Sequence, residues 1–413
     1  MCSNQERNME IMKSGFWRYP IMISLLLAII YLAFIGLGLP DSLLGSAWPT
    51  IRLEMGIPVS YAGIVSMIIA IGTIISSLLS SRVIQKFGPG LVTAVSVGLT
   101  AVALFGFSIS NTFISLCLWA VPYGLGAGAV DAALNNYVAV HYSSRHMSWL
   151  HAFWGLGVTV SPYIMSACLT GGLGWQVGYQ RVSIVQIILT AILFAALPLW
   201  KRSENSKDVK GAANIPLSKA VKIRGVPFVL IAFFCYCALE ATAGLWASSY
   251  LVEARGIHAE TAAQFTAFFY IGETAGRILN GFIADRFGDK NLIRAGIIVM
   301  MIGAVMVLLP VNTISLIGLI VIGLGAAPVY PCIIHATPNN FGKENSQALV
   351  GIQMASAYTG ATLMPPLFGL IAQYVHVSLY PWYLLVFAVL MLCMTELLNH
   401  ATNKTMRNGK RAG

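Results

Sequence analysis

Long apolar stretches, each about 20 residues long, recur along the whole chain between short polar connections. We place them at residues 19–47, 61–80, 90–109, 113–140, 149–170, 178–200, 226–252, 261–284, 291–310, 314–336, 347–373 and 379–399. As helices, such runs cross a hydrocarbon core of about 30 Å. Only helices and closed barrels satisfy their backbone in lipid, and these runs lack the strict alternation of barrel strands. The pattern therefore predicts an all-α membrane protein with about 12 transmembrane helices.

One connection, at residues 201–225, is longer and more polar than the others and divides the spans six and six. We interpret it as a cytoplasmic linker between two six-helix bundles, with a short surface helix near residues 217–223. The predicted domains are a cytoplasmic segment (1–18), the first bundle (19–200), the linker (201–225), the second bundle (226–400) and a cytoplasmic tail (401–413).

The two bundles repeat one another in sequence at an offset of about 200 residues. The phrase SRVIQKFG at 81–88 matches GFIADRFG at 281–288, and both end in a basic residue followed by Phe-Gly. Further matches pair 55–57 with 255–257, 124–127 with 323–326, and 157–162 with 360–365. A parallel repeat of this kind predicts two halves with the same orientation in the membrane.

Composition and charge agree with a membrane protein. Hydrophobic residues make up 57% of the chain and charged residues 10%, against roughly 25% charged in soluble domains. The net charge of +10 does not indicate a nucleic-acid partner, because nearly all of the 25 basic residues fall on one predicted side of the membrane. This positive-inside bias predicts cytoplasmic termini and a multi-pass protein of a cell membrane, such as a bacterial inner or plasma membrane. All seven cysteines except Cys2 lie in predicted spans, and their spacing indicates neither a disulfide nor a metal site.

The sequence GFIADRFGDK at residues 281–290, between the predicted eighth and ninth spans, resembles the cytoplasmic loop of the Major Facilitator Superfamily. The resemblance covers nearly the whole chain and implies alternating access around a central cavity. The first copy of the loop departs from the family pattern, since Gln85 replaces the acidic residue and Ser81 the first glycine. This departure leaves the gating contact of the first loop in doubt, but not the fold.

The loop chemistry suits a gate. Asp285 lies at a predicted helix end, where Arg286, Lys290 or a neighbouring helix terminus can pair with it. We therefore assign Asp285, Arg286, Lys290 and Lys86 to gating. The alternative is a basic loop that only orients the chain.

Five charged residues lie inside apolar runs: Asp41, Asp131, Glu240, Glu273 and Arg277. On insertion scales each charge at mid-span costs about 2.5–3.5 kcal/mol. These groups must face water, pair with one another or carry a proton. Each is therefore a candidate for function.

In the first half, Asp41 follows Pro40 near the outer end of the first span, where the proline kinks the helix. Asp131 belongs to the series Gly124, Gly128, Asp131 and Asn135, whose spacings of four, three and four share one helical face. We interpret Asp131 and Asn135 as part of a cavity wall. The alternatives are a solvated helix end for Asp41 and tight glycine packing around Asp131.

In the second half, Tyr270, Glu273 and Arg277 follow one another at steps of three and four on the eighth span. Glu273 and Arg277 form an i,i+4 pair, so a self-neutralised structural pair is the alternative to substrate binding. Glu240, on the seventh span, has no basic partner nearby in sequence. It is therefore a candidate for protonation or for pairing across the cavity.

Several further residues are candidates for contact with a solute. Trp154 and Tyr358 are candidates for stacking on a sugar or aromatic solute, and Gln353 for a polar contact. Most aromatic residues in such proteins are interface anchors or packing instead. His151 can titrate near neutral pH, although a histidine near a cytoplasmic helix end is usually solvated.

The acids in spans one and four make the chain similar to the fucose-permease-like branch of sugar:proton symporters. The runs at residues 131–136 and 150–157 also resemble that branch. The resemblance implies that Asp131 binds the proton and that Asp41 links proton and substrate. Members of this branch transport different solutes.

We therefore expect proton-coupled uptake of a sugar or related polar metabolite, with the proton as coupling ion, no other cofactor and a functional monomer. Proton-coupling residues are then Asp131, Asp41 and Glu240. The alternative is a drug:proton antiporter, although Ser161-Pro162 lacks the glycine that precedes proline in the efflux motif. A sensor or scaffold does not need four intramembrane acids. An enzyme is disfavoured because no catalytic triad, phosphate loop or metal-ligand cluster stands out.

Overall fold

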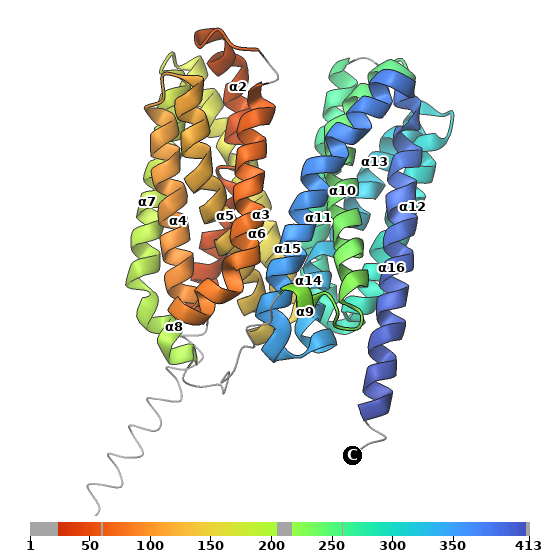
Figure 1. Ribbon diagram of the computed structural model, residues 1–413. Coiled ribbons are helices and arrows are strands. Elements are labelled where there is room, and N and C mark those ends of the chain that lie inside the picture. Colours follow the sequence, from red (N-terminus) through yellow and green to blue (C-terminus); the bar gives the residue numbers. More distant parts are fainter. Residues whose placement is uncertain (1–23, 59–60, 205–216, 258, 410–413) are drawn as a thin grey trace, which may run out of the picture.

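A computed structural model of the protein describes residues 24–58, 61–204, 217–257 and 259–409, which form helices and short connections (Figure 1). The first bundle begins with the span Ser24–Trp48, whose last residues belong to α2 (Leu43–Glu54). It continues with α3 (Tyr61–Phe87), α4 (Pro89–Ser108), α5 (Phe113–His141), α6 (Ser144–Thr170) and α7 (Gly174–Ala195). The second bundle contains α10 (Val226–Ser249), α11 (Ala259–Phe287), α12 (Asp289–Leu308), α13 (Asn312–Ala326), α14 (Val329–Phe341), α15 (Lys343–Ile371) and α16 (Tyr380–Gly409).

The fold class predicted from the sequence is confirmed: the described chain is helical, without strands. Ten described ranges are long and apolar enough to span a membrane, and the last of them, Lys343–Thr402, holds both α15 and α16. The long helix α11 is found in addition to these ten ranges. Between the bundles, α8 (Leu197–Glu204) runs into the linker and α9 (Leu217–Ala220) lies within it, where α9 confirms the short helix expected there.

The structure refines two predicted boundaries. The run predicted as one span at 314–336 lies within the candidate span Asn312–Phe341, which holds two helices, because Pro328 has no N–H for the helical ladder and α13 ends at Ala326. The last helix continues to Gly409, nine residues into the stretch expected as a tail. The N-terminal segment at 1–18 lies outside the described residues.

The repeated Phe-Gly phrase has a backbone explanation. Gly88 joins α3 to α4 with φ 78° and ψ 156°, and Gly288 joins α11 to α12 with φ 76° and ψ 152°. A Cβ atom at Gly288 would meet no atom within 4 Å, so space is not the constraint there. Residues with a side chain rarely adopt a positive φ, so the tight turn itself selects glycine in both halves.

Small residues bring the helices of each bundle close together. A side chain at Gly124 would collide with the Ile69 carbonyl of α3, and Thr73 donates a hydrogen bond to the Gly124 carbonyl at 3.2 Å. In the second bundle, Gly323 lies equally close to the Phe269 carbonyl of α11. Many large apolar side chains point outward and are exposed on the bundle surfaces, while others fill the core. This inverted pattern fits a protein surrounded by lipid.

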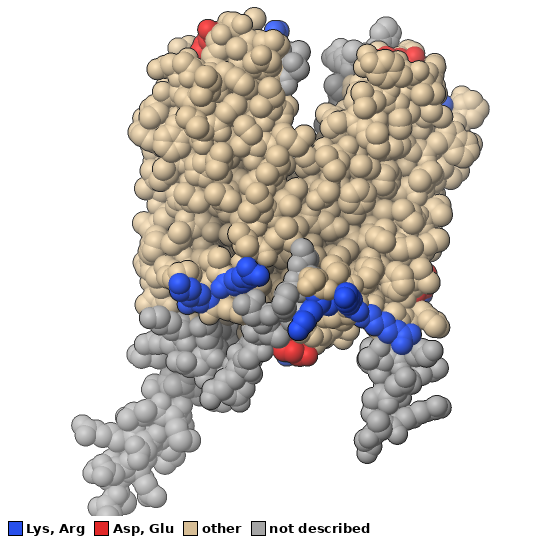
Figure 2. All heavy atoms as spheres, viewed as in Figure 1, with Lys and Arg blue, Asp and Glu red and all other residues tan. Residues whose placement is uncertain are grey.

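The two bundles meet at one end and separate at the other (Figures 1 and 2). We call the end with the α3–α4, α5–α6 and α11–α12 connections the basic end, since Arg82, Lys86, Arg145, Arg286 and Lys290 lie there. We call the opposite end, where Figure 2 shows a notch between the bundles, the open end. The positive-inside pattern predicts that the basic end is cytoplasmic.

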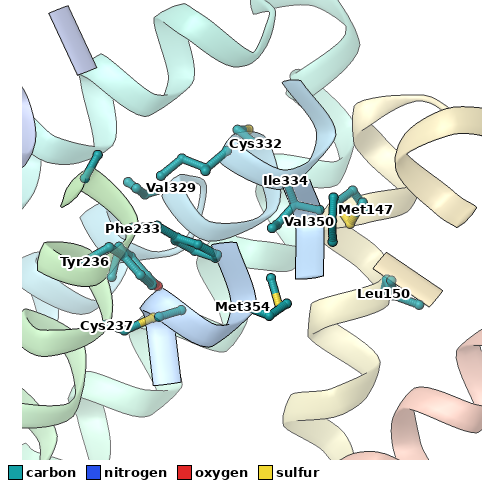
Figure 3. Close-up of a cluster of buried hydrophobic side chains, with 14 of the residues drawn as sticks. Met147, Leu150, Phe233, Tyr236, Cys237, Val329, Cys332, Ile334, Val350 and Met354 are labelled. Atoms are coloured by element: carbon teal, nitrogen blue, oxygen red, sulfur yellow. The ribbon is translucent and has the colours of Figure 1, made fainter. Parts of the chain in front are cut away.

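An apolar layer joins the bundles toward the basic end, near the start of α6 and in α14 and α15, and Figure 3 shows its side chains. Met147 and Leu150 of α6 face Ile334 of α14 and Val350 and Met354 of α15. All five side chains are buried. The layer closes the molecule below the notch.

Candidate functional site

A cavity of about 410 Å³ lies between the bundles and is lined by residues of both. Its charged lining residues are Asp41, Asp131, Glu240 and Arg277. Its aromatic lining residues are Phe34, Phe107, Tyr123, Trp154, Tyr179, Tyr330 and Tyr358. The sequence-predicted residues Asp41, Asp131, Trp154, Glu240, Arg277 and Tyr358 therefore meet at one site, although they come from five helices and one turn.

Asp41 lies on the first-bundle side, in the turn between the helix at 24–38 and α2. The residues before it include Pro40, which lacks an N–H group and favours this break in the helix. The Tyr123 hydroxyl donates to Asp41 Oδ1 and the Trp154 indole N–H donates to Oδ2, each at 2.9 Å. Two donors thus hold an exposed carboxylate in a fixed position in the cavity wall.

Asp131 lies on the interface of the two bundles and is buried, with 3% of its surface exposed. Asn135 donates to Asp131 Oδ1 at 2.7 Å from the next turn of α5. The Tyr358 hydroxyl of α15 donates to Asp131 Oδ2 at 2.5 Å from the opposite bundle. The carboxylate of Asp131 is therefore a direct hydrogen-bonded link between the two halves.

Behind Asp131, the buried His151 contacts Asn135 Oδ1 through Nε2 at 3.0 Å. The Asn135 amide group donates to Asp131, so its oxygen accepts and His151 Nε2 carries a proton. His151 also packs edge-on against the rings of Phe34 and Tyr330. The expectation of a solvated histidine is wrong, because α6 buries His151 within the cavity wall.

The second-bundle side of the cavity carries a cluster that we call the Arg277 cluster: Arg277, Glu240, Glu273 and Tyr236. One guanidinium nitrogen, Nη2, donates to Glu240 Oε1 at 3.0 Å and also to Glu273 Oε1. The Tyr236 hydroxyl contacts the same two oxygens at 3.2 and 3.4 Å. The expectation that Glu240 pairs across the cavity is wrong, because its basic partner is Arg277 of its own bundle.

The Arg277 cluster also reaches the first bundle. The Arg277 guanidinium lies 5.6 Å from the ring centroid of Trp154, whose indole N–H is bonded to Asp41. A cation at this distance is attracted to the ring face. The Trp154 side chain thus contacts both Asp41 of the first bundle and Arg277 of the second.

Some predicted residues lie outside the cavity lining. Glu273 and Asn135 lie behind the lining residues. Glu273 accepts a hydrogen bond from Arg277, and Asn135 donates one to Asp131. Gln353 is buried and accepts a hydrogen bond from Thr337 at 2.9 Å. Tyr270 is half exposed and packs on Gly244 and Phe269. The structure therefore does not bring Gln353 and Tyr270 to the cavity.

Sequence reasoning missed Tyr123 and Tyr236 as site residues. Tyr123 lies eight residues before Asp131 in α5, in the series Tyr123, Ala127, Asp131 and Asn135 at steps of four. Tyr236 precedes Glu240 by four residues in α10. Both tyrosines lie at i,i+4 spacing from the acidic residues or their series, on the same helical face, so this spacing could have identified them as site residues.

Polar contacts between the bundles close the basic end. The Asp285 carboxylate accepts from Arg145 Nε at 2.5 Å, from the Arg145 backbone N–H at 3.3 Å and from Ser143 at 3.2 Å. Ser143 and Arg145 begin α6, so Asp285 caps a helix N-terminus of the other bundle. Of the partners considered from sequence, the neighbouring helix terminus is confirmed.

The other predicted gating residues have different surroundings. Lys86 and Arg286 lie over the rings of the phenylalanines that follow them, at 5.2 and 5.8 Å. Lys290 lies in a small surface pocket on α12. Their roles in gating stay predictions.

A second polar group on the basic end is centred on Asp289. Its carboxylate accepts from Ser144 at 2.6 Å and contacts His335 Nδ1 at 2.7 Å. The other ring nitrogen of His335 faces the Tyr142 carbonyl at 3.1 Å. Both partners of His335 are acceptors, so the arrangement fits a ring with protons on both nitrogens. His335 and Asp289 thus bind the start of α6 from the opposite bundle.

The described residues contain no group of three or more His, Cys, Asp or Glu side chains placed to hold a metal ion. The cavity chemistry instead consists of paired carboxylates, hydroxyl donors and aromatic faces. Such a lining suits a small polar solute and exchangeable protons.

The sequence profile of the Major Facilitator Superfamily matches residues 30–345 and 228–405. The chain belongs to the Major Facilitator Superfamily. It is a multi-pass membrane protein with the fold of this family, and not an enzyme.

Similar proteins come from yeast and bacteria. "Bypass of stop codon protein 6" of Saccharomyces cerevisiae is 24% identical over 62% of this chain and 56% of its own length. The hexuronate transporter of Bacillus subtilis is 23% identical over 63% of this chain and 64% of its own length. The chain thus spans less than two thirds of either relative.

Among solved structures, the E. coli fucose:proton symporter FucP superposes with a TM-score of 0.72 at 16% identity. The match covers 91% of this chain and 98% of that structure. The proton:xylose symporter XylE superposes with a TM-score of 0.73 at 13% identity, over 89% and 94% of the two chains. These likenesses establish the shared fold.

Proposed function

We propose that the protein is a secondary transporter that works by alternating access and takes up a sugar or related small polar metabolite together with protons. The observation that carries the proposal is Asp131. It is a buried carboxylate beside the cavity and is hydrogen-bonded to the opposite bundle through Tyr358. A proton on this carboxylate changes both the charge of the cavity and the contact between the halves.

The arrangement of the two ends supports alternating access. The cavity lies between the bundles, whereas the apolar layer and the Asp285 and Asp289 contacts join them toward the basic end. With the basic end cytoplasmic, this is a state that admits solute from outside. Opening to the cytoplasm requires these contacts to break while the open end closes.

Proton coupling follows from the electrostatics of such a change. An ionised carboxylate inside the membrane is unfavourable, so a proton on Asp131 lowers the free energy of reorientation. A gradient of one pH unit supplies about 1.4 kcal/mol per proton. Tyr123 and Trp154 fix the Asp41 carboxylate in the cavity wall. It is placed there to accept hydrogen bonds from hydroxyl groups of the solute.

The proposal is tested by uptake into proteoliposomes across a panel of radiolabelled sugars, with and without an inward proton gradient. We expect at least one sugar to accumulate only when the gradient is present. Protein-free liposomes provide the control for leakage. Failure of every sugar to accumulate, combined with exchange of a lipophilic cation for protons, contradicts uptake and supports a drug:proton antiporter.

The antiporter remains the second candidate because of one observation. The cavity combines carboxylates with seven aromatic side chains, and aromatic faces next to acids also bind lipophilic cations. The same panel therefore includes an aromatic cation. Its direction of transport relative to the gradient separates the two functions.

A further inference from the structure

We infer that the cavity selects against negatively charged solutes and that Glu240 is the residue that enforces this selection. The inference rests on the proposed transport function and adds the charge class of the solute. It starts from the charges that a solute meets between the bundles.

Three carboxylates and one guanidinium lie in the described cavity lining: Asp41, Asp131, Glu240 and Arg277. A fourth carboxylate, Glu273, lies directly behind Arg277. His151 also lines the cavity, and a neutral ring with its proton on Nε2 satisfies its contact with Asn135. Among the described lining residues, Arg277 is thus the only permanent cation that a bound anion could use.

The Arg277 guanidinium is already paired with two carboxylates. Its Nη2 donates to both Glu240 and Glu273, and its face lies over Trp154. Its Nε atom has no hydrogen-bond partner among the described residues, but this atom has less than 1 Å² of exposed surface. An anion that binds at Nη2 therefore displaces a glutamate, which then keeps its own charge in the same confined space.

The cluster has an inner and an outer carboxylate. The side chains of Glu273 and Arg277 are each 4% exposed, whereas that of Glu240 is 20% exposed. Glu240, and not Arg277, is therefore the charged group that this side of the cavity offers to a solute. Across the cavity, Asp41 presents a second carboxylate.

A solute between these two carboxylates is favoured when it donates hydrogen bonds and disfavoured when it carries negative charge. A neutral polyhydroxylated solute meets this requirement, and so does one with an amino group. The Bacillus subtilis relative is named for hexuronates, which are anions. The Arg277 cluster therefore predicts a different charge preference for this chain.

The test uses matched sugars that share a ring and differ in charge: glucose, glucosamine and glucuronate, and the galactose series likewise. Uptake into proteoliposomes is measured for each, together with the shift that each produces in the melting temperature of the purified protein. We expect the best neutral or aminated sugar to be taken up at least ten-fold faster than its uronate. Equal or faster uptake of a uronate overturns the inference and leaves the transport function standing.

If no sugar is taken up, the proposed sugar function fails and the melting series decides the charge question. Stabilisation by a uronate overturns the inference. Stabilisation by neutral or aminated sugars alone supports it. The two failures are therefore distinguishable.

The role of Glu240 is tested with Glu240→Gln, which keeps the shape and removes the charge. We expect the ratio of uronate to neutral uptake to rise at least ten-fold. Glu240→Asp keeps the charge and should keep the low ratio, so loss of packing is separated from loss of charge. Glu396→Gln is the matched control, because Glu396 pairs with Arg294 on an exposed surface. An unchanged ratio in Glu240→Gln assigns the selection to another residue and overturns the role of Glu240.

Discussion

Asp131 shows how a residue that is unfavourable in a membrane is retained at a place where its charge is useful. On insertion scales an ionised carboxylate at mid-span costs about 2.5–3.5 kcal/mol. Asn135 and Tyr358 offset part of this cost by donating hydrogen bonds to its two oxygens. Hydrogen bonds to a charged group each contribute about 1.5–3 kcal/mol. These two donors thus stabilise the ionised side chain relative to a carboxylate without partners, and a proton changes that balance.

Substitution of Asp131 by asparagine keeps the size of the side chain and removes the exchangeable proton. We expect Asp131→Asn to abolish gradient-driven accumulation and to leave solute exchange across the membrane largely intact. Uptake and counterflow in the same proteoliposomes measure the two activities. Loss of both activities in a folded variant indicates a structural role for Asp131 instead.

The hydroxyl of Tyr358 donates a hydrogen bond to Asp131 from the other bundle, and in the proposed mechanism it couples the protonation of Asp131 to that bundle. Tyr358→Phe keeps the ring and removes the hydroxyl, whose hydrogen bond contributes about 1.5–3 kcal/mol when the carboxylate is ionised. We expect the balance between the outward- and inward-open states to shift toward the inward-open state by about ten-fold or more. Spin labels at Arg52→Cys and Glu253→Cys in a cysteine-free background measure the separation of the bundles at the open end.

Tyr163→Phe is the control for this measurement. Tyr163 of α6 is 73% exposed, so removal of its hydroxyl should not move the distance distribution. Equal distributions in Tyr358→Phe and the unmodified protein contradict a coupling role for Tyr358.

At the scale of the elements, two helix crossings between the bundles differ in character. The crossing of α6 with α11 is polar, with Arg145 on Asp285 and Asn280 donating to Ser148 at 2.6 Å. The crossing of α3 with α15 depends on small residues, with Gly351 against the backbone of Ser77. The acidic residue of the repeated loop is present in the polar crossing and replaced by Gln85 in the other. The copy of the loop at 281–288 therefore lies at the crossing that is closed by ionic contacts, and the copy at 81–88 lies at the crossing that is closed by close packing of small residues.

A methyl group at Gly351 tests the steric crossing. A Cβ atom there would lie 2.5 Å from the Ser77 carbonyl oxygen and 2.8 Å from the Ser80 hydroxyl. Overpacking of this kind typically costs about 1–3 kcal/mol. We expect Gly351→Ala to depopulate the state with a closed basic end, seen as shorter distances between the labels at Arg52→Cys and Glu253→Cys.

Gly63→Ala is the matched control, because a Cβ at Gly63 of α3 would meet no atom within 4 Å. It should leave the distances unchanged. A Gly351→Ala variant that behaves like Gly63→Ala contradicts the steric role of this crossing.

At the scale of the whole molecule, the orientation of the chain decides which end of the cavity faces the cell exterior. The positive-inside pattern predicts that the basic end is cytoplasmic. Glu253 lies at the open end, just after α10, and Lys343 lies at the basic end, where α15 begins. Both residues are exposed, so both positions are accessible to a reagent.

We therefore expect Glu253→Cys, in a cysteine-free background, to react with a membrane-impermeant maleimide in intact cells. Lys343→Cys should react only after the cells are permeabilised. The reverse pattern contradicts the predicted orientation and assigns the opposite direction to the cavity.

Much of the fold and part of the site were predictable from sequence, because their physical causes are local. The length and hydropathy of the runs indicate helices, and the repeat at residues 81–88 and 281–288 indicates two equivalent halves. The charges in apolar runs identified Asp41, Asp131, Glu240 and Arg277, because a charge in lipid is unfavourable unless it is paired, hydrated or neutralised by a proton. The positive φ at Gly88 and Gly288 then gave the reason for the repeated phrase.

The pairings depended on the tertiary structure, because each joins residues distant in sequence. The Asp285 carboxylate has two basic residues nearby in sequence, yet it bonds to Arg145, 140 positions away. Asp131 and Tyr358 are separated by 227 positions and meet because the two bundles pack together. Tyr270 and Gln353 matched the pattern and still lie outside the cavity, because helix rotation and tilt are set by packing. The sequence by itself thus determined the membrane helices, the repeat and the charged residues. Their patterns depend on how apolar and charged side chains interact with lipid and water, and not on which helices later become neighbours. Only the tertiary structure decided their partners, since hydrogen bonds and ion pairs depend on distances of a few ångströms between helices.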